Sequence, residues 1–328
     1  MDRDVDVLII GAGPAGSSTA LHLARRAPSL AARTLVIDKA KHPRHKLCGG
    51  GLVNDVDTIL GDLGLDLREV PRVSAQVSHL HLDGRGVGVK LSDIAFHVVR
   101  RREIAAWLVD RGRAAGVRVE EETAVKSLAR GPEGVIVETS RGTIRARAVV
   151  GADGSKGMTR RFVAGDAGST ARLIEVMIPP PPRLDPPLPA EDAVFEFGGV
   201  QSGVQGYFWS FPMEIEGRAM RNFGVYDSRV RDEDPSAGSL KRYLAEGLAR
   251  QGVDMDACKV EGHPIHLFSA KSALSAPGIV LAGDAAGADP LLGEGISPAL
   301  GYGDLAARAL IDAFRAGDFA FSGYTRQV

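Results

Sequence analysis

The amino-acid sequence predicts an α/β fold with a β-rich part inserted into it, and three observations support this prediction. The chain begins with an apolar run at residues 5–10, a glycine turn, a helical pattern at 14–26 and a second apolar run at 34–37. This order is typical of a βαβ unit with buried parallel strands. A similar apolar run, followed by glycine and aspartate, returns at 279–282. Between these ends, proline pairs and short apolar runs suit an antiparallel sheet.

The length and composition are those of an ordinary globular protein. The chain has 328 residues, of which 44% are hydrophobic and 25% charged, and such a length normally gives about two domains. A net charge of -1 gives no basic excess for nucleic acid, and two cysteines argue against a disulfide framework and favour the cytoplasm. We expect neither a signal peptide nor a membrane span, while a peripheral membrane contact stays open.

The other elements follow from the spacing of apolar residues. A helix is predicted at 101–115, where Ile104, Ala105, Leu108 and Val109 recur at helical spacing. A stiff loop is predicted around the prolines at 179–182 and 186–187, because proline cannot donate to a sheet. Further strands are expected at 117–120, 135–139, 143–150, 173–178, 193–197, 207–211 and 222–226, and further helices at 240–251 and 297–314.

The first glycine turn has the spacing of a dinucleotide-binding site. Gly11 permits the tight turn, Gly13 lets the backbone approach a pyrophosphate, and Gly16 allows close packing of helix on strand. The helix that follows offers free N–H groups to the phosphates. Asp38, at the end of the second strand, can accept hydrogen bonds from ribose hydroxyls, which favours FAD or NAD over NADP. The alternative is a glycine turn with a purely structural role.

Two later segments favour FAD over NAD. Asp153 and Gly154 follow the strand at 143–150, and Gly283 and Asp284 follow the strand at 279–282. Each places an acid just beyond a strand end, where ligands bind in α/β sheets. The dense glycines before the last helix, at residues 289–297, can offer N–H groups to an oxyanion or a flavin carbonyl.

In order and spacing, these motifs resemble the flavoprotein superfamily of para-hydroxybenzoate hydroxylase. Within it the chain resembles the geranylgeranyl reductase family. KLCGGG at 46–51 is similar to that family's Cys-Gly-Gly-Gly loop, and YFWSFP at 207–212 fits its Y-x-W-x-F-P motif. Where the family continues with G-x-G, this chain has Asn222, Phe223 and Gly224 and keeps only the second glycine. Family members carry a further helical segment at the end, so a short C-terminal region is expected.

The resemblance implies bound FAD, reduced by NAD(P)H that visits transiently. By the same resemblance, Arg101 pairs with the pyrophosphate, Val125 touches the adenine through its backbone, and Asp284 bonds the ribityl chain. The implied catalytic residues beside the flavin are Cys48, Tyr207 and Trp209. The implied cofactor-binding residues are Gly11, Gly13, Pro14, Ala15, Gly16, Asp38, Lys39, Cys48, Gly49, Arg101, Val125, Asp153, Gly154, Gly283, Asp284, Pro290, Gly293, Gly295 and Ile296.

Several of these residues have a simpler interpretation as well. Cys48 can be a small residue tolerated in a loop, and Asp153 can cap a turn. Tyr207, Trp209 and Phe211 alternate and therefore share one face of a strand, where they either pack a core or form an apolar wall for an isoprenoid chain. No histidine has a ligand spacing with cysteines or carboxylates, so no metal site is predicted.

The sequence therefore predicts a FAD-binding Rossmann-like domain of residues 1–70, 98–165 and 270–328, with an inserted mixed or antiparallel substrate-binding domain of residues 71–97 and 166–269. The predicted reaction is reduction of C=C bonds in a prenyl lipid or prenylated quinone. The alternatives are a flavin monooxygenase or halogenase-like enzyme acting on an aromatic or quinone substrate, and a non-catalytic lipid or quinone carrier. An unactivated alkene also needs a proton donor, which the sequence does not identify. It leaves the oligomeric state open.

Overall fold

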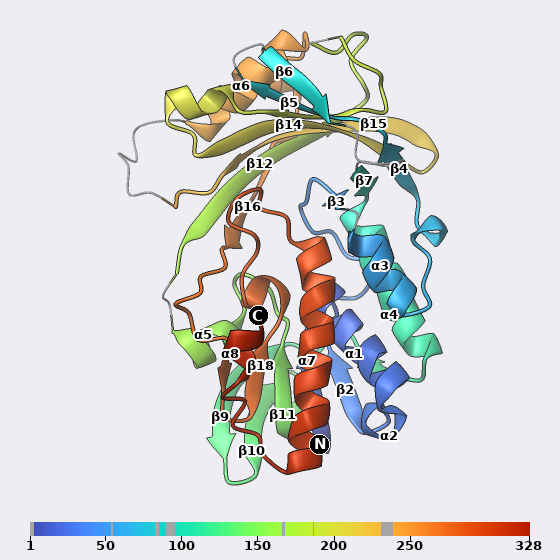
Figure 1. Cartoon of the computed structure of the whole chain (residues 1–328), viewed down its shortest axis with the longest axis vertical. Helices are drawn as coiled ribbons and strands as arrows, with labels where there is room; N and C mark the ends of the chain where they lie inside the picture. Colours follow the sequence, from blue (N-terminus) through green and yellow to red (C-terminus); the bar gives the residue numbers. More distant parts are fainter. Residues whose placement is uncertain are drawn as a thin grey trace.

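Two sheets organise the chain, one below the other in the view of Figure 1. The computed structural model describes residues 3–53, 55–82, 85–89, 96–165, 168–185, 187–230 and 239–328. Pro186, part of the predicted proline loop, lies outside the described residues. No helix in the described part of the chain is long and apolar enough to cross a membrane.

The lower sheet has eight strands, and its centre is parallel. The main order is β17 (Ser275–Ala276), β18 (Ile279–Leu281), β11 (Gly142–Gly151), β1 (Arg3–Ile10), β2 (Thr34–Ile37) and β8 (Arg118–Glu120). β10 (Gly134–Thr139) and β9 (Val125–Gly131) extend β11 as an antiparallel pair. Since β1, β2, β11 and β18 run parallel, their carboxyl ends lie along one edge of the sheet.

Helices cover this sheet, and the closest pair is α1 (Pro14–Arg26) with α7 (Ile296–Ala316). Pro14 occupies the first turn of α1, where its fixed φ suits a helix start. The glycine at 303 lets the two helices touch, because a Cβ on Gly303 would lie 2.4 Å from the Ser18 Cβ. Ser18 Oγ donates to the Leu300 carbonyl at 2.7 Å. The other helices are α2 (Pro28–Ala31), α3 (Asp55–Asp62), α4 (Arg101–Ala114), α5 (Met158–Ala164) and α8 (Tyr324–Gln327).

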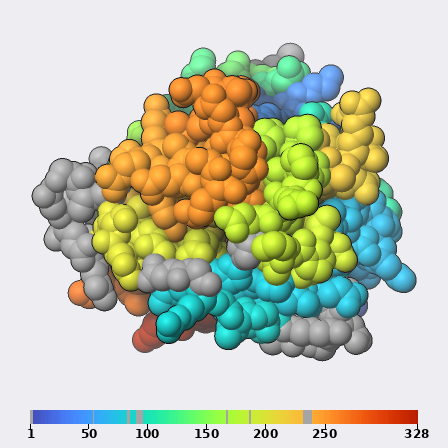
Figure 2. All heavy atoms as spheres, turned by 90° about the horizontal axis from the view of Figure 1, so that it is seen from above, coloured from blue at the N-terminus to red at the C-terminus, as the bar shows by residue number. Residues whose placement is uncertain are grey.

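The upper sheet has seven strands and is antiparallel except where β13 pairs in parallel with β5. Its order is β16 (Glu261–His266), β12 (Thr170–Ile178), β15 (Arg218–Asp227), β14 (Gly206–Ile215), β13 (Ala193–Glu196), β5 (Ser78–Leu82) and β6 (Arg85–Val89). Helix α6 (Leu240–Arg250) packs on its outer face against Phe208, Phe223 and Val225. Figure 2 looks onto this end of the molecule, where the orange atoms of the segment that includes α6 cover a broad area.

The inner face of the upper sheet is aromatic and turns toward the lower part of the molecule. Tyr207, Trp209 and Phe211 form one cluster there with Leu47 and Ala288, which belong to loops of the lower part. We call this the aromatic face. A small sheet of β3 (Gly51–Leu52), β7 (Phe96–Val99) and β4 (Arg72–Ala75) lies between the two larger ones. The predicted α/β class with an inserted, largely antiparallel sheet is confirmed, while the domain boundaries stay a prediction.

Candidate active site

The three glycine motifs meet at the carboxyl edge of the parallel strands. A Cβ on Gly11 would lie 2.2 Å from the Ala152 carbonyl oxygen, so the first motif touches the second. A Cβ on Gly283 would lie 2.8 Å from the Cβ of Ala15, so the third motif touches the start of α1. Gly11 and Gly283 also have positive φ values of 105° and 62°, which favour glycine. Segments far apart in the sequence therefore meet at one edge of the sheet.

The start of α1 is built to receive an anion. Its N-cap residue, Gly13, provides no side-chain cap, so the first N–H groups of the helix face outward. Among the described residues, the Arg101 guanidinium alone lies near the position where Gly13 would carry a Cβ, with Nη2 3.6 Å away. Helix α4 begins with Arg101 and brings this side chain to the glycine turn. The arrangement leaves room for a phosphate group between backbone and guanidinium.

Arg101 is a buried cation without a carboxylate partner among the described residues. It is only 7% exposed. Burial lowers its pKa, while the nearby Cys48, Asp284 and Asp38 act in the opposite direction. A buried charge is costly unless an ion of opposite sign lies beside it. A pyrophosphate at the α1 N-terminus would supply that charge, so Arg101 fits its predicted role.

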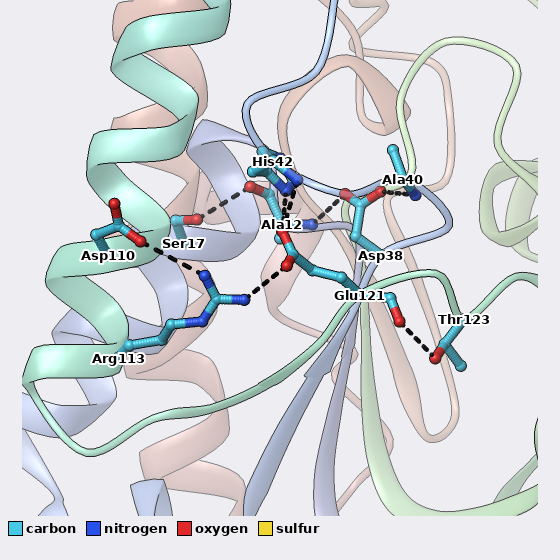
Figure 3. Close-up of polar contacts among 9 residues, drawn as sticks. All are labelled: Ala12, Ser17, Asp38, Ala40, His42, Asp110, Arg113, Glu121 and Thr123. Carbon is cyan, nitrogen blue, oxygen red and sulfur yellow. Dashed lines mark hydrogen bonds and ion pairs between the residues drawn. The ribbon is translucent and has the colours of Figure 1, made fainter.

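Asp38 ties the glycine turn to the end of β2, as Figure 3 shows. Its Oδ2 accepts from the Ala12 N–H and its Oδ1 from the Ala40 N–H, both at 2.8 Å. The Asp38 carbonyl accepts from the Thr123 N–H at 2.8 Å, which brings the start of β9, at Val125, close to the same strand end. Lys39 is exposed. Asp38 thus fixes the turn and keeps further acceptor sites for a ribose.

A cluster of ion pairs and hydrogen bonds holds the loop that follows Asp38, at His42 (Figure 3). Glu121 accepts from the His42 backbone N–H at 2.6 Å and pairs with Arg113 at 2.9 Å. Arg113 in turn lies 3.4 Å from Asp110 on α4. Although burial alone would raise it, the hydrogen bonds from His42 and Arg113 hold the pKa of Glu121 below its usual value. The sequence reasoning did not single out this support.

Asp153 has a structural role in this conformation. Both of its carboxylate oxygens accept hydrogen bonds from Thr159, one from the hydroxyl and one from the backbone N–H at 3.1 Å. It therefore anchors the first turn of α5, and burial raises the pKa of its carboxyl group. Gly154 has a φ of 84°, and its Cβ position has no neighbour within 4 Å in the described part of the chain. The turn-capping interpretation describes Asp153 here, and its contact with a ligand stays a prediction.

Asp284 is held by a lysine that the sequence reasoning had not assigned to the site. Lys46 Nζ lies 2.7 Å from Asp284 Oδ2. Although burial alone would raise it, Lys46 and Arg101 hold the pKa of Asp284 below its usual value. A Cβ on Gly295 would lie 3.2 Å from Asp284 Oδ1. The KLCGGG loop, Asp284 and the glycines before α7 are thereby brought together.

The loop before α7 rests on two tyrosines of the aromatic face. The Tyr207 hydroxyl donates to the Leu292 carbonyl at 2.6 Å, and the Tyr226 hydroxyl donates to the Pro290 carbonyl at 3.2 Å. Gly293 has a φ of 69°, and a Cβ there would lie 2.5 Å from the Tyr226 ring. The backbone from Pro290 to Ile296 therefore lies between the aromatic face and the start of α7. Tyr226 is a support that the sequence reasoning missed.

Two carboxyl groups near these loops have pKa values above the usual range of a glutamate. Glu294 accepts from the Ser297 backbone N–H at 2.9 Å, and burial raises its pKa to about 7. Glu175 on β12 is likewise buried, and its pKa is raised to about 7. Glu175 was also missed, although it is the one charged residue in the otherwise apolar stretch LIEVMI at 173–178. Such an acid inside an apolar strand is a signal that could have identified it.

Cys48 lies between the glycine edge and the aromatic face. Its Sγ accepts from the Gly50 N–H at 3.4 Å, and burial raises the pKa of the thiol. A Cβ on the adjacent Gly49 would lie 3.4 Å from the Trp209 Nε1 and 3.5 Å from the Phe211 ring. The thiol is therefore protonated near neutral pH, which suits packing or hydrogen bonding better than attack as a thiolate.

We expect Cys48→Ser to keep FAD bound and to slow turnover. The hydroxyl is smaller and more polar than the thiol, so contacts beside the aromatic face change while the glycine edge stays intact. The measurement compares the FAD content and steady-state rate of the variant with those of Cys258→Ser. Cys258 belongs to the cluster beneath α6, on the opposite side of the sheet. A Cys48→Ser protein with wild-type turnover would rule out a role for the thiol.

In the described ranges, no group of three or more histidine, cysteine, aspartate or glutamate side chains is arranged to hold a metal ion. The chemistry at this edge is instead that of helix N–H groups, one buried arginine and paired carboxylates. These groups suit a nucleotide with a pyrophosphate. The adjoining aromatic face suits an apolar ligand.

Comparisons with known proteins agree with this geometry. The family model described as "FAD binding domain" matches residues 4–314. Digeranylgeranylglycerophospholipid reductase 3 of Methanosphaera stadtmanae is 26% identical over 350 residues, covering 97% of this chain and 80% of the relative. The menaquinone reductase of Mycolicibacterium smegmatis is 27% identical over 328 residues, covering 94% and 77%.

Solved structures share the fold over the whole chain. A geranylgeranyl bacteriochlorophyll reductase-like protein of Thermoplasma acidophilum has a TM-score of 0.81 at 22% identity, covering 100% of this chain and 82% of that one. A probable FAD-dependent monooxygenase of Pseudomonas aeruginosa has a TM-score of 0.71 at 19% identity, covering 99% and 92%. At these identities the likeness concerns the fold, which serves several reactions.

Proposed function

This chain belongs to the FAD binding domain family and is a FAD-dependent oxidoreductase, and we propose that it reduces C=C bonds in a prenyl lipid or a prenylated quinone. The observation that carries the proposal is the aromatic face. Its buried side chains Tyr207, Trp209 and Phe211 pack against loops that also hold Cys48 and Gly293. Relatives named as lipid and menaquinone reductases support the same substrate class.

The residues at the strand ends fit FAD. Gly11, Gly13 and Gly16 with Arg101 would hold the pyrophosphate, and Asp38 would hold the adenosine ribose. Asp284 and the loop before α7 would hold the ribityl chain and the ring system, where N–H groups favour negative charge. When bound and reduced by NAD(P)H, FAD supplies a hydride.

The chain's own contribution to the reaction is to exclude water and to orient an apolar substrate. An alkene without a neighbouring carbonyl has no polar group that a side chain could bind. Its orientation therefore depends on how well the substrate fits the shape of the site. The aromatic face is a rigid surface, because its rings contact one another and have little conformational freedom. Trp209 stacks on Phe211 with centroids 6.1 Å apart, and Tyr207 lies 5.6 Å from Tyr226. Rings fixed in this way can hold an isoprenoid chain in one register.

The proposal is tested by anaerobic incubation of FAD-loaded, dithionite-reduced protein with geranylgeranyl lipids and prenylated quinones. We expect products heavier by two hydrogen atoms for each bond reduced, as measured by mass spectrometry. An aerobic arm with NAD(P)H detects the main alternative: oxygen or halide incorporated into an aromatic substrate would indicate a monooxygenase or halogenase. Lipid binding without flavin reduction by NADH or NADPH would indicate a carrier.

We expect Trp209→Ala to lower kcat/KM for long prenyl substrates more than for short ones. The indole is buried and contacts a row of rings, so its loss removes wall area that only a long chain reaches. The measurement is the ratio of kcat/KM for geranylgeranyl and geranyl substrates. Trp107→Ala is the matched control, because Trp107 lies on α4 and donates to Glu69 away from the aromatic face. An equal loss for both substrates in Trp209→Ala would contradict the proposed wall.

A further inference from the structure

Glu175 is a deeply buried carboxyl group on the aromatic face. Along β12, Leu173 and Met177 belong to the aromatic cluster, whereas Ile174 and Val176 pack beneath α6. Alternation therefore places Glu175 on the aromatic face between Leu173 and Met177. It is only 7% exposed. Burial of a carboxyl group at such a position destabilises the folded state, which suggests that the group serves a function.

The neighbours of Glu175 come from three different elements. Glu175 pairs in register with Gly224 of β15. Because Gly224 has no side chain, the Trp209 ring occupies the space beside it, and a Cβ on Gly224 would lie 2.2 Å from Trp209 Cζ2. The indole thus lies beside the carboxyl group. Asn222 and the Cys48 N–H also face it. Glu175 therefore lies where the aromatic wall meets the Cys48 loop.

Two polar atoms in this cluster have no protein partner. Asn222 Oδ1 accepts from Trp209 Nε1 at 2.6 Å, which fixes the amide orientation. Among the described residues, neither Asn222 Nδ2 nor Glu175 Oε2 has a hydrogen-bond partner. Both atoms are buried, and unpaired buried polar atoms in native proteins are rare. A free carboxyl oxygen beside an apolar substrate wall is the arrangement required of a proton donor.

The charge state of Glu175 suits this task. Burial raises its pKa to about 7, and the carboxylate of Glu261, its register partner on β16, adds to the effect. The nearby Asn222 amide and Cys48 N–H partly offset this rise. Glu261 itself is different, since its side chain is 33% exposed and pairs with His45 and Lys259. A carboxyl group that titrates near neutral pH can donate a proton and regain it from water.

We propose that Glu175 is the catalytic acid that protonates the substrate when a C=C bond is reduced, an inference that rests on the proposed function. Bound, reduced FAD would supply a hydride, whose two electrons would form the first C–H bond. The π electron pair of the broken double bond takes the Glu175 proton and forms the second C–H bond. Glu175 is left as a carboxylate and is reprotonated from solvent before the next turnover. The alkene gains two hydrogen atoms, and the cofactor is oxidised by two electrons.

Other buried acids are engaged elsewhere. Glu294 Oε1 accepts from both the N–H and the hydroxyl of Ser297. The Tyr207 hydroxyl donates to the Leu292 carbonyl. The Cys48 Sγ accepts from the Gly50 N–H. Glu175 Oε2 is buried and has no partner among the described residues, so it is left for a substrate.

The test compares FAD-loaded wild type with Glu175→Gln, which keeps the size of the side chain. We expect the rate of prenyl-lipid reduction to fall at least about 100-fold, as for loss of a general acid. FAD affinity and the rate of flavin reduction by NAD(P)H should stay unchanged. Glu175→Asp should restore part of the rate. Glu214→Gln, an exposed glutamate on β14, is the matched control and should behave as wild type.

A second readout does not depend on turnover. Infrared difference spectra of the FAD-loaded protein should show a protonated carboxyl band that disappears with a midpoint near pH 7 in wild type and is missing in Glu175→Gln. Glu294 titrates in the same range, so the spectra are recorded in the Glu294→Gln background as well. A band from Glu175 that titrates below about pH 5, near the value of an ordinary glutamate, would overturn the inference.

The two proposals fail in different ways. If wild type adds no hydrogen to any prenyl substrate, the proposed function fails. If wild type reduces the lipid and Glu175→Gln does so within about threefold of its rate, the proton donor is another group and the inference about Glu175 fails. The same holds if Glu294→Gln abolishes reduction while Glu175→Gln does not.

Discussion

Gly16→Ala is expected to abolish FAD binding. Gly16 lies in the first turn of α1, where a Cβ would come within 1.9 Å of the Gly11 carbonyl oxygen and 3.1 Å of Ile9 Cγ2. The first of these is a backbone atom in a turn that is itself held by the Ile37 carbonyl, which accepts from the Gly11 N–H at 2.7 Å. Because the turn cannot yield, α1 must move away from β1, and its N–H groups leave the pyrophosphate position.

The measurement is the FAD content of the purified variant and its affinity for added FAD. We expect the Kd to rise by at least about 100-fold, equivalent to about 2.7 kcal/mol of lost binding free energy. Gly112→Ala is the matched control, since Gly112 lies within α4 and no described residue outside its own turn of the helix lies within 4 Å of its Cβ position. That substitution should leave binding unchanged and slightly stabilise the helix. Wild-type FAD affinity in Gly16→Ala would show that the turn tolerates displacement.

The parts of the fold that follow from local patterns were predicted closely. The helix at 14–26 and the strand at 34–37 have the predicted bounds, because buried parallel strands are continuous apolar runs and α1 starts at a proline. The strands at 78–82, 85–89 and 261–266 were not predicted. The strands at 78–82 and 85–89 are short and place histidine or glycine, not β-branched or aromatic residues, between their leucines and valines. The partners β13 of the strand at 78–82 and β12 of the strand at 261–266 lie far away in the sequence.

The candidate site divides in the same way. The glycine motifs are local signals, because the turn conformation itself requires glycine. The Lys46–Asp284 pair joins residues 238 positions apart, and no local pattern reports such a contact. Glu175 depends on sheet register: its neighbours Gly224 and Glu261 are set by the pairing of β12 with β15 and β16. Sequence reasoning could mark the unusual residue but not what faces it.

Arg221→Met is expected to lower the stability of the upper sheet by about 3–5 kcal/mol, because several buried acceptors lose their partner at a cost of about 1–3 kcal/mol each. Arg221 is 1% exposed. Its guanidinium donates to the carbonyls of Ala190 and Asp192 at 2.6 and 2.8 Å and to the Ser210 hydroxyl at 2.8 Å. Burial lowers its pKa to about 10, so it stays charged at neutral pH. Methionine fills similar space but leaves these acceptors buried and unpaired.

The loss should be visible as a lower urea midpoint of the FAD-loaded protein. Arg221 joins the segment before β13 to the β14 and β15 pair, and these strands carry the aromatic face. Its removal should therefore weaken binding of a prenyl substrate together with stability, while FAD stays bound at the distant glycine edge. Arg218→Met on the exposed end of β15 is the matched control and should change the midpoint little. An unchanged midpoint in Arg221→Met would mean that water replaces the guanidinium. Ring packing, and not Arg221, would then hold the aromatic face in place.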